Sequence, residues 1–161
     1  MAKDKIGIVG LGLIGGSLGM ALRGAYTVKG MAHKAADAEY ALDAGIADET
    51  VADLSRFGDC RAVIVCTPLA IVRENVAKLA SMYPDAVISD VGSVKGMLSG
   101  IPGRVIGGHP MAGTEKSGIR AARPRLLENA YYILTDYGGD GEALAYMKDV
   151  AAAAGAIPVT M

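Results

Sequence analysis

The sequence predicts a single α/β domain built on a doubly wound, mostly parallel sheet. Short apolar runs typical of buried strands alternate along the chain with stretches in which apolar residues have helical spacing. The 22 glycines fall largely between these runs, where tight turns are needed. A chain of 161 residues fits one domain with a substantial core, and no linker or low-complexity tract divides it.

The first part of the chain has the pattern of a βαβ unit. A short apolar strand is expected over 5–9 and a helix with amphipathic spacing over 13–22. A second strand over 26–31 and a second helix over 35–44 follow, and Gly45 is expected to end that helix at its C′ position. Strands joined by helices in this way lie parallel.

The same alternation continues to the end of the chain. An apolar strand over 61–66 precedes Thr67, a predicted N-cap, and Pro68, predicted to lie in the first turn of a helix that extends to residue 82. The later expected elements are strands over 86–90 and 104–108, a weakly helical segment over 117–127, a strand over 130–135, a helix over 140–154 and a strand over 157–161.

Glycine-rich and polar motifs follow five of the predicted strands. Ligands of doubly wound sheets bind beyond the carboxyl ends of the strands, so we expect these motifs to share one rim. They are the glycine turn after the first strand, Ala32-His33-Lys34, Cys66-Thr67-Pro68, Asp90-Val91-Gly92-Ser93 and His109.

The first of these motifs, from Gly10 to Gly15, reads G-x-G-x-x-G between a strand and a helix. Gly10 permits the tight turn, Gly12 lets the backbone reach a pyrophosphate, and Gly15 lets the helix pack closely on the sheet. Leu13 and Ile14 begin the helix whose free N–H groups would face the phosphates. The motif predicts a Rossmann-type dinucleotide-binding domain; the alternative is a packing turn without a ligand.

The end of the second strand predicts which dinucleotide binds. NAD-binding domains usually carry an acidic residue there to accept hydrogen bonds from the ribose. This chain has the small Ala32 followed by His33 and Lys34, which would make room for a 2′-phosphate and attract it. We therefore expect NADP, with NAD less favoured; in the alternative interpretation Lys34 is only a solvated lysine.

His109 is the candidate proton acceptor. Glycines at 107 and 108 precede it, and Pro110 fixes the chain after it. An imidazole changes its charge near neutral pH, which suits a general base. The alternative is a polar residue that merely ends a strand. Asp90, at the end of another strand, is expected to cap the turn that follows it and not to act as the base.

Three segments, GLGLIGGS, DVGSVKG and GGHPMAGTEKSG, occur in this order and together resemble the prephenate and arogenate dehydrogenase family of tyrosine biosynthesis. The resemblance covers essentially the whole chain. It implies oxidative decarboxylation of a cyclohexadienol with hydride transfer to a nicotinamide. His109 would accept the proton of the ring hydroxyl, and Ser93 would orient His109 and contact the substrate; Ser93 as a turn-forming hydroxyl remains the alternative.

The resemblance also implies contacts to the cofactor. Thr67 and Pro68 would border the ribose and nicotinamide, with Cys66 packed behind them, and Gly92 would lie in the turn beside Ser93. A nucleophilic role for Cys66 is not expected, because hydride transfer needs no covalent intermediate.

Members of the family generally continue into a helical domain that forms a homodimer and supplies an arginine for a substrate carboxylate. This chain stops at Met161, so residues 1–161 are expected to be the dinucleotide-binding domain, without that further domain. Two alternatives remain: a dinucleotide-binding regulatory module without turnover, and a β-hydroxyacid dehydrogenase, which would not explain the glycines around His109. Prephenate and arogenate are not distinguished.

Composition restricts the partners. The formal net charge is −1 and no basic stripe is evident, so nucleic acid is not expected to bind. No signal peptide is apparent, and no apolar run approaches the about 18 residues of a membrane span. The two cysteines do not suggest a disulfide framework, which favours a cytoplasmic setting, and no metal site is predicted.

Overall fold

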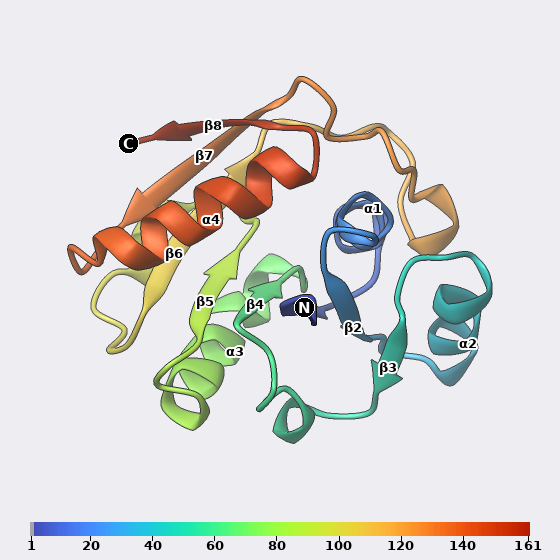
Figure 1. The fold of residues 1–161 in the computed structure, drawn as a ribbon, viewed down its shortest axis with the longest axis horizontal. Helices are drawn as coiled ribbons and strands as arrows, with labels where there is room; N and C mark the ends of the chain where they lie inside the picture. The colour runs from blue at the N-terminus through green and yellow to red at the C-terminus, as the bar shows by residue number, and fades with distance from the viewer. Residues whose placement is uncertain (1) are drawn as a thin grey trace.

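One continuous sheet organises the computed structural model, which describes residues 2–161 (Figure 1). The strand order is β3-β2-β1-β4-β5-β6-β7-β8; β7 is antiparallel to β6 and every other neighbouring pair is parallel. The predicted fold class is thereby confirmed. The strands are β1 (Lys5–Val9), β2 (Thr27–Met31), β3 (Glu49–Val51), β4 (Ala62–Val65), β5 (Val87–Asp90), β6 (Val105–Pro110), β7 (Tyr131–Asp136) and β8 (Ile157–Thr160).

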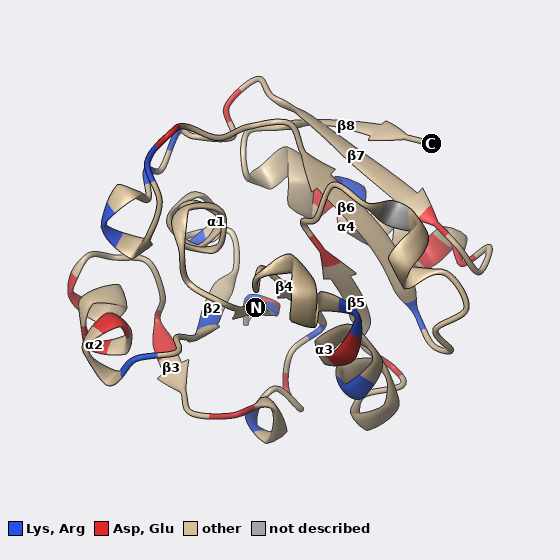
Figure 2. Cartoon of the chain, turned by 180° about the vertical axis from the view of Figure 1, so that it is seen from behind, with Lys and Arg blue, Asp and Glu red and all other residues tan. Residues whose placement is uncertain are grey.

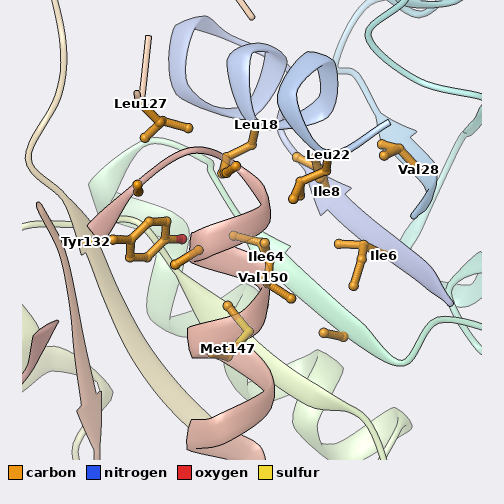
Figure 3. Close-up of a cluster of buried hydrophobic side chains, with 14 of the residues drawn as sticks. Ile6, Ile8, Leu18, Leu22, Val28, Ile64, Leu127, Tyr132, Met147 and Val150 are labelled. Carbon is orange, nitrogen blue, oxygen red and sulfur yellow. The ribbon is translucent and has the colours of Figure 1, made fainter. Parts of the chain in front are cut away.

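Helices cover both faces of this sheet. The central strands are buried on both faces, so their runs of Ile and Val are nearly continuous. Side chains of β1 and β4 alternate between the two sides: Ile8 and Ile64 pack with α1 and α4, whereas Val65 packs with α3 (Figure 3). The helices are α1 (Leu13–Leu22), α2 (Ala35–Asp43), α3 (Leu69–Met82) and α4 (Gly141–Ala153), and the short 3-10 turns are η1 (Leu54–Arg56), η2 (Lys95–Leu98) and η3 (Ile119–Ala121).

Two predicted elements differ from the structure. The strand expected over 104–108 is β6, which extends to Pro110 because it pairs with β7, so that His109 lies opposite Ile133 within the sheet. The segment expected to be weakly helical over 117–127 forms only η3. Gly118, with a φ of 87°, and Pro124 interrupt any longer helix there.

A third difference concerns β3, which the sequence did not reveal. It has only three residues, all partly buried, and therefore no alternation of apolar and polar side chains. Its pairing with β2 defines it. Gly45, by contrast, follows α2 with a φ of 75°, as expected for a glycine at C′.

The neighbouring Tyr131 and Tyr132 differ in burial. Tyr132 is fully buried between the sheet and α4 (Figure 3), whereas Tyr131 is 58% exposed because it points to the opposite side of β7. Met111 is also largely exposed, whereas Met97 packs against the core.

The Tyr132 hydroxyl is buried without a hydrogen-bond partner among the described residues. Replacing Tyr132 with phenylalanine should raise the free energy of unfolding by about 1 kcal/mol, because the ring is kept and an unsatisfied polar group is removed. Urea unfolding of both proteins measures this difference.

Tyr146 provides the matched control. Its hydroxyl donates a hydrogen bond to the Asp4 carboxylate at 3.0 Å, so Tyr146→Phe should lower stability slightly. A loss of stability in Tyr132→Phe would contradict the assignment of an unpaired hydroxyl.

Positively and negatively charged residues are interspersed along the elements (Figure 2). Among residues 2–161, no helix is both long and apolar enough to cross a membrane, and no three His, Cys, Asp or Glu side chains are grouped to hold a metal ion. A ligand-binding site is therefore expected at the carboxyl ends of the strands.

Candidate functional site

A cleft of about 960 Å³ lies at the carboxyl ends of the strands. It spans the switch point between β1 and β4, where the chain direction across the sheet reverses. It brings together most of the rim residues predicted from the sequence. Those in its wall are Gly10, Gly12, Leu13, Ile14, Ala32, His33, Cys66, Thr67, Pro68, Gly92 and Ser93.

Two glycines of the first turn are required by close packing. Gly10 has a φ of 99°, and a Cβ there would lie 2.8 Å from the carbonyl oxygen of Cys66. A Cβ on Gly15 would lie 1.9 Å from the carbonyl oxygen of Gly10, so any side chain would separate α1 from the turn. Gly15 is buried beneath the cleft and does not line it.

Gly12 is different, because a Cβ at this position would meet no atom within 4 Å. The backbone of the turn is therefore open to the cleft. A glycine in open space with an ordinary φ is not needed for packing. It leaves room for a ligand to approach the main chain.

The N-terminus of α1 fits an anion. Its N-cap is Gly12, no side chain caps it, and its first turn has no acidic residue. The N-terminus of α4 is satisfied within the protein, since the Asp140 side chain accepts a hydrogen bond from the Ala143 N–H at 3.0 Å and Glu142 lies in the first turn. The α1 end thus has the free N–H groups and positive dipole end that bind phosphate groups.

The part of the cleft wall that follows β4 is formed by Thr67, Pro68 and the first turns of α3. Thr67 is not the N-cap that the sequence indicated: α3 begins at Leu69, and Pro68 is its N-cap. The Thr67 hydroxyl instead accepts a hydrogen bond from the Asn75 amide at 3.4 Å. Pro68 has a ψ of 144°, outside the helical range, so the helix begins one residue later than expected.

Cys66 is itself part of the cleft wall and is partly buried. Burial, with the nearby Asp90 carboxylate, raises the pKa of the Cys66 thiol, so the thiol stays protonated and is a poor nucleophile. Cys60 and Cys66 are both free, in agreement with the absence of a predicted disulfide.

Asp90 joins the ends of β5 and β6. Its side chain is fully buried, and one carboxylate oxygen accepts a hydrogen bond from the Gly108 N–H at 2.9 Å while the other accepts one from the Gly92 N–H at 3.1 Å. The second bond is the turn cap that the sequence predicted. The first is a contact between strands, and the two together fix the backbone next to Ser93 and next to His109.

Ser93 and His109 are placed differently. Ser93 is exposed in the wall of the cleft, whereas His109 is partly buried in β6 and outside the wall. No hydrogen bond joins their side chains among the described residues, so the orientation of His109 by Ser93 stays a prediction. Lys34 is likewise outside the wall and exposed, at the N-cap of α2.

Several wall residues were not singled out from the sequence as cofactor contacts. Asp37 lies in the first turn of α2, three residues after Lys34, and helical spacing could have indicated it. Ile71 and Asn75 lie four residues apart on one face of α3. Residues 116–118 come from far along the chain, at the end of the segment GGHPMAGTEKSG, and nothing in that local pattern indicates that they reach this cleft.

The comparisons with known proteins agree with this geometry. The family profile "Prephenate dehydrogenase, nucleotide-binding domain" matches residues 18–159. The prephenate dehydrogenase of Bacillus subtilis is 35% identical over 162 aligned residues, which cover 92% of this chain and 44% of the relative. The chain therefore spans less than half the length of that protein.

Two solved structures are also similar. Synechocystis arogenate dehydrogenase superposes with a TM-score of 0.89 at 33% identity, covering 98% of this chain and 59% of the other. The Aquifex aeolicus prephenate dehydrogenase in complex with hydroxyphenyl propionate and NAD⁺ gives a TM-score of 0.85 at 30% identity, covering 100% and 60%. The chain belongs to the prephenate dehydrogenase family and comprises its nucleotide-binding domain.

Proposed function

We propose that this chain binds a nicotinamide dinucleotide and supplies the proton acceptor for oxidative decarboxylation of prephenate or arogenate. The observation that carries the proposal is the pair of hydrogen bonds to Asp90, which fixes His109 on β6 next to the turn that presents Ser93 to the cleft. A relative with the same fold has been crystallised with NAD⁺ and a phenolic ligand.

The bound cofactor and His109 have separate roles in the proposed reaction. A bound nicotinamide supplies the hydride acceptor. As the C–H bond of the carbinol carbon breaks, His109 takes the proton of the hydroxyl on that carbon, and a ring carbonyl forms. The bond to the ring carboxylate then breaks and releases carbon dioxide. Its electron pair moves through the ring to the oxygen, which takes the proton back and becomes a phenol.

Arg120 and Arg125, in the segment between β6 and β7, are not assigned to the substrate. The guanidinium of Arg120 lies 4.4 Å from the centroid of the Tyr40 ring, a cation–π contact within the protein. Arg125 is within 3.5 Å of the Glu128 carboxylate. We assign the substrate carboxylate to the further helical domain that the family resemblance implies.

We also propose that the preferred dinucleotide is NADP. Ala32 and His33 line the cleft beyond β2, Lys34 follows them at the surface, and residues 32–34 include no carboxylate. The carboxylate of Asp37 in the same wall is the observation that favours NAD instead, because it could accept hydrogen bonds from ribose hydroxyls.

Titration of the chain with NADPH and NADH distinguishes these cofactors. We expect tighter binding of NADPH than of NADH. Lys34→Ala should lower the affinity for NADPH by about tenfold and leave the affinity for NADH almost unchanged, because only NADPH has the 2′-phosphate. Equal affinity, or tighter NADH, would overturn the NADP proposal. The variant Asp37→Ala would then be expected to have a lower affinity for NADH.

A further inference from the structure

We infer that Lys116 is a direct contact to the diphosphate of the dinucleotide, held there by a segment that crosses α1. We call residues 116–123 the α1 strap. The inference rests on the proposed dinucleotide binding and names a residue that the glycine turn does not include.

Small residues of α1 receive the strap. A Cβ on Gly16 would lie 2.8 Å from the Cβ of Ala122, so only glycine allows this approach. The Arg123 N–H donates a hydrogen bond to the hydroxyl of the fully buried Ser17 at 2.9 Å. Ile119, 6% exposed, packs into the core beside α1. Gly16 and Ser17 therefore serve the strap and not the cofactor directly.

A further contact secures the strap on the α2 side. Arg120 stacks over the ring of Tyr40, which belongs to α2. In Figure 1 the light orange turn at residues 119–121 lies beside α1 and above α2. The end of the strap after Gly118 is thus fixed to two helices, and the N-termini of both helices face the cleft.

The beginning of the strap, Lys116-Ser117-Gly118, forms part of the cleft wall. The Lys116 N–H donates a hydrogen bond to the Thr114 hydroxyl at 2.9 Å, which shapes the chain just before the strap. Gly118 has a φ of 87°, a conformation that favours glycine, and turns the chain from the cleft wall towards α1.

Lys116 is the one Lys or Arg among the described residues of the cleft wall. The strap that carries it packs on Gly16 and Ser17. The Gly16 N–H is already bonded to the Gly12 carbonyl oxygen, so the N–H groups free for an anion lie just before it, at the start of α1. A diphosphate at that helix end would lie in the cleft that both Lys116 and the start of α1 line, where a lysine ammonium group can pair with its charge. The 2′-phosphate would instead lie beyond β2, near His33.

The test compares Lys116→Ala with the unchanged chain by titration with NADH and with NADPH. We expect the affinity for both to fall by a similar factor of about tenfold, because both have the diphosphate. Lys116→Arg should recover most of the affinity. Lys148→Ala, at an exposed position on α4, is the matched control and should bind both cofactors as the unchanged chain does.

The dependence of cofactor affinity on salt concentration provides a second test. The affinity of the unchanged chain for NADH should decrease more steeply with ionic strength than that of Lys116→Ala, because one charge pair is lost in the variant. Lys116 is exposed, so equal thermal unfolding of the two proteins is expected and verifies the fold.

Two results would overturn the inference while the proposed function stands. In one, Lys116→Ala binds both cofactors normally; in the other, it loses affinity for NADPH alone, which would move the contact to the 2′-phosphate. If the unchanged chain binds neither NADH nor NADPH, the proposed function fails, and the Lys116 contact fails with it.

Discussion

Gly15→Ala is expected to destabilise the chain by about 3 kcal/mol or more, and to abolish dinucleotide binding, because the new Cβ has no space. Its ideal position is 1.9 Å from the carbonyl oxygen of Gly10, a backbone atom that cannot rotate away. The helix would have to move off the sheet or the turn would have to open. Chemical unfolding and NADPH titration of the variant measure the two effects.

Gly12→Ala is the informative comparison. A Cβ at Gly12 would meet no protein atom within 4 Å, so this variant should keep most of its stability. If the diphosphate approaches the backbone there, the added methyl group should weaken NADPH binding by about tenfold or more. Normal binding by Gly12→Ala would be inconsistent with a dinucleotide on this turn. Normal stability of Gly15→Ala would contradict the packing argument.

In a protein that joins this domain to the further helical domain, His109→Ala is expected to lower the rate of NADPH formation by about a hundredfold or more with prephenate or arogenate, because the proton acceptor is removed. Cofactor affinity should change little, since His109 is outside the cleft wall. Initial rates at saturating cofactor, together with NADPH titration of the same variant, separate chemistry from binding.

The same measurement decides between an enzyme and a regulatory module. A module without turnover would form no NADPH with either substrate even when joined to the further helical domain, and His109→Ala would then have no rate to lower. Unchanged turnover in the variant would remove His109 from the proposed mechanism. Loss of cofactor binding together with turnover would indicate that His109 supports the fold of β6 and is not the base.

Local patterns accounted for the order of the elements. The apolar strand at 5–9, the glycine turn and the following helix can be predicted because each signal lies within about ten residues, where alternation and helical spacing act. The shared rim also followed, because parallel strands place their carboxyl ends on one edge. The three-residue strand β3 was missed because a strand so short has no periodicity.

The candidate site was predicted less completely. The glycine turn, Ser93 and the β4 end were found from sequence and do meet in one cleft. The start of α3 was displaced because Pro68 has a ψ of 144° and so lies outside the helix, which makes Pro68 and not Thr67 the N-cap. Asp37 was missed because the ribose contact was expected at the strand end and not one helical turn later.

What the sequence alone determined is therefore most of the helices and strands, the fold class and the glycine turn, all of which depend on residues close together in the chain. Only the tertiary structure decided that His109 lies within β6, that Asp90 joins two strands and that the α1 strap brings Lys116 to the cleft. These depend on pairs such as Ser17 and Arg123, which are 106 residues apart and whose contact no local pattern encodes. Such contacts form only when the complete fold packs the two segments together.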